Sequence, residues 1–169
     1  MWPPHRRLAA MTQHTVGIAD LTAGAGDITL VTIGLGSCVA IALHDRANRV
    51  GALAHVLLPH HALTADTPSA GKAASTAVPA MLSRMHVLGA RRDIEARLVG
   101  GASMFAALLA PGAISLGARN VQAARAACAA HDIPIVGEAV GGDFGRSVTF
   151  DVSTGRVFVR SVRGDDVVL

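Results

Sequence analysis

Two apolar segments separated by a short polar turn constrain the fold of this chain more than any other feature. Residues 37–43 and 50–58 have the length and composition of strands. Residues 45–48, Asp-Arg-Ala-Asn, have the composition of a tight turn. The two segments are therefore predicted to pair as an antiparallel hairpin.

The register of this hairpin brings a thiol and an imidazole together. With the turn centred between Arg46 and Ala47, Cys38 stands directly opposite His55. Directly opposed residues share one face, with Cβ atoms about 4.5 to 5.5 Å apart. The other face is predicted to enter the core. It carries Val39, Ile41, Leu43, Val50, Ala52 and Ala54.

The remaining pattern predicts strands and helices that do not alternate regularly. Strands are expected over residues 15–21, 28–33, 94–99, 133–139, 147–152 and 157–162, and helices over residues 75–88, 103–109 and 118–130. The first two strands are expected to form an opening hairpin or meander through the glycine-rich turn at residues 23–27. The order predicts an α/β fold of mixed, largely antiparallel β-sheets layered with helices, without regular βαβ units.

Length and composition favour one folded domain. The chain has 169 residues, 51% of them hydrophobic and 16% charged, which excludes wholesale disorder. We expect a flexible N-terminal tail over residues 1–13 and a single domain over residues 14–169. No export signal is evident, and two cysteines 90 residues apart form neither a disulfide framework nor a zinc motif, so a cytoplasmic location is expected.

Membrane insertion and nucleic-acid binding are not expected. Residues 98–118 lack charged side chains, but four glycines and Pro111 interrupt them, so we interpret this stretch as part of a soluble core. The net charge is only +3, aromatic residues make up 3% of the chain, and there is no tyrosine to stack on bases.

The predicted pairing of Cys38 with His55 is typical of nucleophilic catalysis. An imidazolium beside a thiol stabilises the thiolate, which is the nucleophilic form. The glycine bend ending at Gly36 allows a close approach of substrate, and backbone N–H groups of Gly36, Ser37 and Cys38 could face a developing oxyanion. Thr32, on the preceding strand, could orient the imidazole through its hydroxyl.

Alternatives remain open at this point. A cysteine in an apolar strand is more often inert core than nucleophile. Ser37 is a second candidate nucleophile, although a thiolate is intrinsically better. Gly34 and Gly36 could belong to a dinucleotide loop, but the full glycine motif is absent.

Two further groups are interpreted as structural. His60 and His61 with Asp66 could suggest a metal site, but adjacent histidines rarely share one coordination sphere, and a solvated loop is the simpler interpretation. Cys128 falls on the buried side of an alanine-rich helix and is expected to contribute packing alone.

Several ordered segments resemble the CheD family of chemoreceptor glutamine deamidases. The resemblance covers roughly residues 16–162 and is carried by residues 32–40 (TIGLGSCVA), 51–59 (GALAHVLLP), 100–105 (GGASMF), 116–120 (LGARN) and 141–146 (GGDFGR). Several motifs in order are more specific than any one of them. Residues 72–77 depart from the family, with Ala73 and Ser75 where similar sequences often have Tyr and Asp.

The resemblance implies a bacterial chemotaxis enzyme, a protein-glutamine glutaminase. Such an enzyme hydrolyses glutamine side chains on the cytoplasmic helices of methyl-accepting chemoreceptors to glutamate through a thioester, and releases ammonia. Some members also hydrolyse receptor methyl esters. The implied nucleophile is Cys38, the implied base His55 and the implied orienting residue Thr32, on an α/β sandwich related to toxin deamidases with a Cys-His site.

The resemblance implies no metal and no organic cofactor. In many bacteria the phosphatase CheC binds the deamidase, which makes CheC an expected partner. Two other functions stay open: a non-catalytic adaptor that binds chemotaxis proteins such as CheC or the receptor, and a thiol hydrolase or protease acting on other acyl groups.

Overall fold

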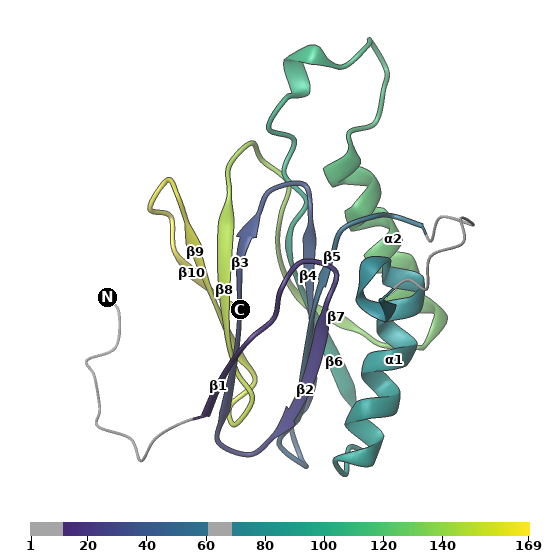
Figure 1. Ribbon diagram of the computed structural model, residues 1–169, viewed down its shortest axis with the longest axis vertical. Helices are drawn as coiled ribbons and strands as arrows, with labels where there is room; N and C mark the ends of the chain where they lie inside the picture. The colour runs from purple at the N-terminus through teal and green to yellow at the C-terminus, as the bar shows by residue number, and fades with distance from the viewer. Residues whose placement is uncertain (1–11, 61–68) are drawn as a thin grey trace.

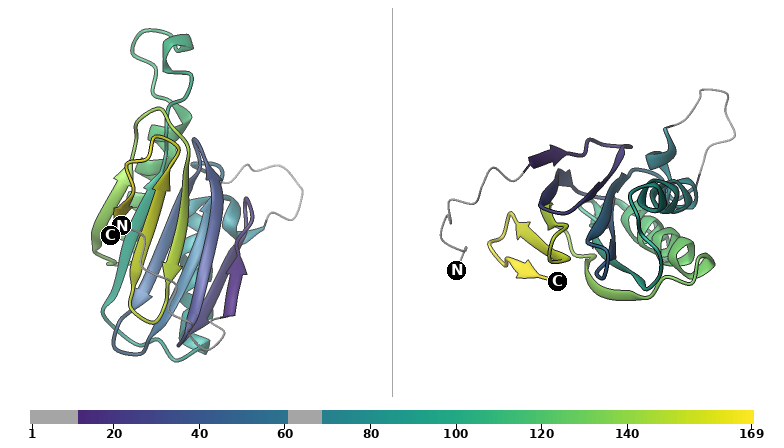
Figure 2. Two further views of the ribbon diagram at one scale, coloured as in Figure 1. Left: turned by 90° about the vertical axis from the view of Figure 1, so that its left-hand side faces the viewer. Right: turned by 90° about the horizontal axis from the view of Figure 1, so that it is seen from below.

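The protein has three layers: an outer sheet, an inner sheet and a pair of helices on the far face of the inner sheet (Figures 1 and 2). The structure is a computed structural model and describes residues 12–60 and 69–169. The predicted mixed α/β fold with largely antiparallel sheets and covering helices is confirmed. The predicted division into tail and domain stays a prediction, because residues 1–11 lie outside the described part, while Thr12 and Gln13 belong to a strand.

The outer sheet has the strand order β1-β3-β8-β9-β10. Its strands are β1 (Thr12–Thr15), β3 (Ile28–Leu35), β8 (Arg146–Asp151), β9 (Arg156–Ser161) and β10 (Val167–Val168). The inner sheet has the order β2-β5-β4-β6-β7. Its strands are β2 (Leu21–Ala25), β4 (Val39–Asp45), β5 (Val50–Val56), β6 (Ile94–Gly100) and β7 (Ile135–Val140). The helical segments are the 3₁₀ turns η1 (Ala70–Lys72) and η2 (Ala106–Leu108) and the helices α1 (Ala74–Val87) and α2 (Leu116–Ala130).

The central strands β4 and β5 are buried along their whole length because both faces of the inner sheet are covered. One face packs against α1 and α2, and it carries the six residues predicted to enter the core. The other face packs against the outer sheet and includes Cys38, Ala40, Ala42 and Leu53. Cys128 is fully buried in the cluster under the helices, as predicted.

The β4–β5 hairpin forms, but its register differs from the prediction by two residues. Ala40, and not Cys38, stands opposite His55. Asp45 remains in the strand because its carboxylate accepts hydrogen bonds from the backbone N–H of Asn48 and of Arg91, which moves the turn one residue along the chain. Because the side-chain period of a strand is two, this shift keeps Cys38 and His55 on the same face.

The predicted opening hairpin is wrong. Residues 17–20 form a turn instead of a strand, and β2 and β3 belong to different sheets: β2 pairs with β5, and β3 pairs with β1 and β8. The turn between β2 and β3 carries Gly26 in the left-handed region, and its N–H bonds the carbonyl of Arg49. The chain therefore passes from one layer to the other at a point where sequence spacing suggested a local pair.

The uncharged stretch at residues 98–118 is divided among β6, a loop with η2 and the first turn of α2. The loop projects beyond the strand ends at the top of Figure 1. Most of its apolar side chains are exposed, including Met104, Phe105 and Leu108, so the predicted burial is wrong for the loop. Of the predicted helix over residues 103–109, only η2 forms, and most of this segment is exposed. Within the described ranges, no helix has the length and apolarity needed to cross a membrane.

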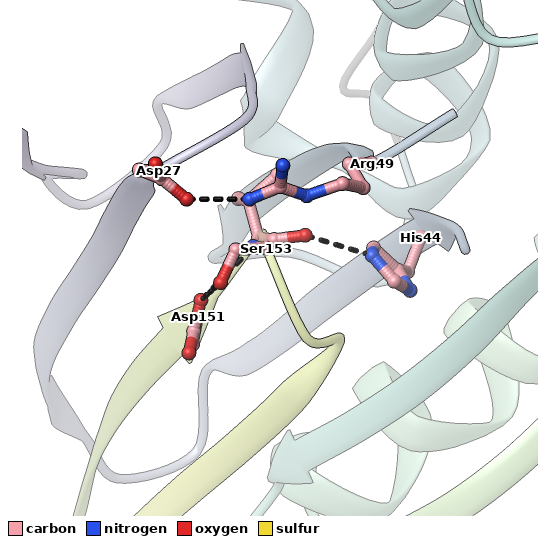
Figure 3. Close-up of polar contacts among 6 residues, drawn as sticks. Asp27, His44, Arg49, Asp151 and Ser153 are labelled. Carbon is pink, nitrogen blue, oxygen red and sulfur yellow. Dashed lines mark hydrogen bonds and ion pairs between the residues drawn. The ribbon is translucent and has the colours of Figure 1, made fainter. Parts of the chain in front are cut away.

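Polar contacts tie the two sheets together at the end opposite Cys38 (Figure 3). The buried His44, near the end of β4, has its Nε2 atom 2.9 Å from the carbonyl oxygen of Val152 in the β8–β9 turn. The neighbouring Ser153 hydroxyl donates to Asp151. Arg49, in the turn between β4 and β5, pairs with Asp27 in the turn between β2 and β3. The glycine bend between β3 and β4 lies at the other end of the sandwich, next to Cys38.

Candidate active site

Cys38 and His55 face the space between the two sheets. Cys38 directly precedes β4, and alternation along the strand gives it the same face as Ala40, the residue opposite His55. The two residues are therefore diagonal neighbours across the hairpin, a relation in which a long side chain still reaches its neighbour. His55 is fully buried, and Cys38 is 7% exposed.

Thr32 reaches the imidazole from the outer sheet. Its Oγ1 atom lies 2.7 Å from Nδ1 of His55 and 2.7 Å from the carbonyl oxygen of Val16. A hydroxyl has one hydrogen, and a carbonyl can only accept. Thr32 therefore donates to Val16 and accepts from the His55 Nδ1–H. This chain of bonds selects the tautomer in which Nε2 carries the lone pair.

The Nε2 atom of His55 is buried and has no hydrogen-bond partner among the described residues. A buried ring nitrogen with a lone pair is suited to accept a proton from a neighbouring acid. The thiol of Cys38 is on the same face of the hairpin. The arrangement can therefore supply a nucleophile, a base and a group that orients the base.

Burial favours the neutral form of both Cys38 and His55. Desolvation raises the pKa of the Cys38 thiol, and a smaller opposing effect comes from its own backbone N–H. Desolvation lowers the pKa of His55. Both shifts favour the neutral thiol and the neutral imidazole, and no hydrogen bond joins the Cys38 sulfur to Nε2 of His55 among the described residues. Cys128 is further removed from reactivity, since burial raises its pKa to about 11.

Backbone contacts fix the bend between β3 and β4. The carbonyl of Gly36 accepts from the N–H of Ala102 at 2.9 Å, and the carbonyl of Cys38 accepts from the N–H of Gly101 at 2.8 Å. The bend is close-packed at Gly36, where a Cβ atom would lie 3.1 Å from the sulfur of Met104. The Gly36–Ser37 and Cys38–Val39 peptide groups, which flank the Ser37–Cys38 peptide, are therefore both held by the segment after β6.

An apolar cavity of about 230 Å³ opens beside Ser37. It is lined by the projecting loop and the start of α2, including Met104, Phe105 and Leu116. Phe105 is 73% exposed at its rim. We call residues 103–115 the apolar lobe. A larger cavity of about 480 Å³, lined by the end of α1, the start of β6 and the residues that follow α2, shares no residue with this site.

The metal alternative considered for His60, His61 and Asp66 lies mostly outside the described residues. His61 and Asp66 lie outside the described residues, and the described ranges contain no group of three or more side chains arranged to hold a metal ion. Ser37, the alternative nucleophile, lines the apolar cavity, and no contact between its hydroxyl and a base is recorded among the described residues.

Two residues contact the site that the sequence analysis did not single out. Val16 supplies the carbonyl that orients Thr32, a role for which its side chain gives no signal. Asn120, on α2, donates from its side chain to the carbonyls of Ser37 and Leu57. The polar Asn120 on the buried face of an apolar helix was a usable signal for such a contact.

Comparisons with known proteins agree on one family. The family model described as "CheD chemotactic sensory transduction" matches residues 57–161. A Clostridium botulinum protein named "Probable chemoreceptor glutamine deamidase CheD" is 38% identical over 148 residues, which cover 87% of this chain and 91% of the relative. A Clostridium tetani protein of the same name is 39% identical over 151 residues, covering 89% and 92%. The range matched by the family model begins after His55, so the site described above rests on its own geometry.

Proposed function

This chain belongs to the CheD family, and from that premise we propose that it hydrolyses the side-chain amides of selected glutamines in the cytoplasmic helices of chemoreceptors. The products are glutamate and ammonia. Cys38 is the nucleophile, His55 the general base and acid, and Thr32 the group that orients His55. The curated relatives carry the name of a chemoreceptor glutamine deamidase, which supports the substrate class.

The observation that carries this proposal is the position of the Thr32 hydroxyl between Val16 and His55. It leaves the lone pair on Nε2, the nitrogen that is free of other partners among the described residues. An inert core histidine would be expected to satisfy both nitrogens. A buried imidazole held in one tautomer, on the same face of the hairpin as a cysteine, supports nucleophilic catalysis.

In the first half of the reaction, the Cys38 sulfur attacks the carbonyl carbon of the glutamine amide while His55 Nε2 takes the thiol proton. The backbone N–H groups of Ser37 and Cys38 stabilise the negative charge that develops on the amide oxygen. His55 then returns the proton to the nitrogen as the C–N bond breaks. Ammonia leaves, and the substrate remains attached to Cys38 as a thioester.

In the second half, His55 takes a proton from a water molecule as its oxygen attacks the thioester carbonyl. The C–S bond breaks, the sulfur recovers its proton from His55, and glutamate is released. Since both groups are neutral at the start and at the end, the cycle needs no prior ion pair. A methyl ester would form the same thioester with loss of methanol, so receptor methylesterase activity belongs to this proposal.

The receptor segment is proposed to approach over the apolar lobe. The lobe carries exposed apolar side chains, and its cavity opens directly beside Ser37. Exposed apolar patches of this kind mark surfaces that bind other proteins. We further propose a cytoplasmic location and CheC as a second partner, and the resemblance to the CheD family supports both.

Mass spectrometry of receptor cytoplasmic fragments tests the proposal. Fragments incubated with the protein should gain the mass that accompanies conversion of an amide to a carboxylate, at a small number of glutamines. Ammonia should appear in equal amount. Fragments that bind the protein and keep all of their glutamines would instead support a non-catalytic adaptor.

A further inference from the structure

We propose that Asn120 is a positioning residue for this reaction, because its amide fixes the peptide group between Ser37 and Cys38 and so aims the Cys38 N–H at the reacting carbonyl. This inference rests on the proposed function of Cys38. It assigns a role to a residue that touches neither the substrate nor the thiol.

Asn120 joins the two segments that carry the nucleophile and the base. Its Nδ2 atom donates to the carbonyl oxygen of Ser37 at 2.9 Å and to that of Leu57 at 3.1 Å. Ser37 directly precedes Cys38, and Leu57 follows His55 by two residues. Asn120 is fully buried. One side chain thus spans the space between the bend and the end of β5.

The geometry of the peptide bond converts this contact into control of the Cys38 N–H. In a trans peptide the carbonyl and the following N–H point in opposite directions within one plane. Holding the Ser37 carbonyl toward α2 therefore directs the Cys38 N–H away from the helix.

The position of Asn120 is itself fixed by the close approach of α2 to the β6–η2 loop. A Cβ atom on Gly117 would lie 2.3 Å from the carbonyl oxygen of Ala102. The same loop holds the bend through the N–H groups of Gly101 and Ala102. Helix, loop and bend therefore form one rigid unit, and the carbonyls of Gly36, Ser37 and Cys38 are each anchored to it.

The test separates oxyanion stabilisation from nucleophile reactivity. Ammonia release from a receptor fragment requires both, whereas alkylation of Cys38 by iodoacetamide forms no oxyanion. Asn120→Ala and the isosteric Asn120→Asp remove the two donors, and Gln122→Ala is the matched control on an exposed position of the same helix. We expect kcat to fall about 10-fold to 100-fold in both Asn120 variants, with KM and the alkylation rate changed by less than about twofold.

Equal losses in deamidation and alkylation would overturn the inference, since they would mean that Asn120 only maintains the placement of Cys38. Unchanged deamidation would overturn it as well. Circular dichroism measures the folded fraction of each variant, and loss of the fold with both substitutions would assign Asn120 to stability instead. Cys38→Ala is assayed in parallel: activity in that variant rejects the proposed function, whereas an inactive Cys38→Ala with active Asn120 variants rejects only the role of Asn120.

Discussion

The hydroxyl of Thr32 determines which nitrogen of His55 carries the lone pair. Because Thr32 donates to the Val16 carbonyl, it can only accept from Nδ1. A neutral imidazole without this partner would distribute its proton between both nitrogens. The contribution of Thr32 is therefore expected to be orientation of the base, which a substitution can remove while leaving the thiol in place.

Thr32→Val tests this role because valine keeps the shape and loses the hydroxyl. We predict that kcat for ammonia release falls about 10-fold to 100-fold, less than on loss of the nucleophile. Thr29→Val makes the same change elsewhere on β3 and is expected to retain parental kcat. A parental rate in Thr32→Val would show that His55 does not need this partner.

The neutral resting pair predicts the pH dependence of Cys38 alkylation. The raised pKa of Cys38 and the lowered pKa of His55 keep the thiolate scarce at neutral pH. The rate of iodoacetamide labelling should therefore rise steadily from about pH 6 to pH 9, without a fast plateau on the acid side. Cys128 should label more slowly throughout. A plateau of fast labelling near pH 6 would indicate an ion pair and contradict the assignment.

At the residue level, the sequence was sufficient to bring Cys38, His55 and Thr32 into consideration but not to define their contacts. Side chains alternate between the two faces of a strand, so an error of two residues in the predicted register still places Cys38 and His55 on the same face. Asn120 contacts Ser37 across 83 positions of the chain, and no local pattern encodes such a pair.

Among the elements, the apolar lobe differs most from what its sequence suggested. Its lack of charge favoured burial, yet Phe105 and Leu108 are largely exposed. Hydrophobic composition alone does not provide a neighbouring element to cover a loop. Under the proposed function, an uncovered apolar loop beside Ser37 serves as a docking surface.

Phe105→Ala tests the lobe as the docking element for the receptor. We predict that KM for a receptor fragment rises about tenfold, equivalent to ~1.4 kcal/mol, while kcat changes little, because an exposed aromatic anchor contributes to binding and not to the chemistry. Val87→Ala removes a comparably exposed apolar side chain from α1 and should leave KM unchanged. A fall in kcat at constant KM would place Phe105 in the reaction itself.

The spacing of apolar residues predicts the longer helices and strands but not the shortest strands. Helices α1 and α2 begin and end close to the expected residues because their apolar spacing is helical. Strand β10 has two residues and β1 is fully exposed, so neither carries an apolar alternation that could be recognised. Their existence depends on pairing with β9 and β3.

At the scale of the whole molecule, the two sheets are held together at both ends by buried polar groups. His55 and Thr32 join them at the reactive end, and His44 with Val152 joins them at the other. The number of sheets could not be predicted, since β2 and β3 are neighbours in sequence but pair with β5 and β8. The fold class could be predicted from the sequence because it depends only on the order of helices and strands along the chain.

Both buried histidines link the stability of the molecule to pH. Burial lowers the pKa of His44, as it does that of His55. As the pH falls, these histidines therefore bind protons at a higher pH in the unfolded chain, where their pKa values are near 6.5, than in the folded chain. The contribution of each histidine to the free energy of unfolding is complete above about pH 6.5. It is lost as the pH falls below that value, by up to about 1.4 kcal/mol per pH unit.

His44→Gln tests this linkage because glutamine keeps a donor for Val152 and does not titrate. We predict that the free energy of unfolding, measured by urea denaturation between pH 7.5 and pH 5.5, falls with about half the parental slope in this variant. The slope is the readout, so a constant loss of stability from the substitution does not affect the result. A parental slope in His44→Gln would mean that His44 does not contribute.

The rate of ammonia release from a receptor cytoplasmic fragment by Cys38→Ala tests the central claim most directly. Cys128→Ala is the matched control, since it makes the same change at the other cysteine. The proposed mechanism predicts that Cys38→Ala releases ammonia no faster than the fragment alone, while Cys128→Ala retains the parental rate per folded molecule. Release by Cys38→Ala at the parental rate would contradict the assignment of this cysteine as the nucleophile.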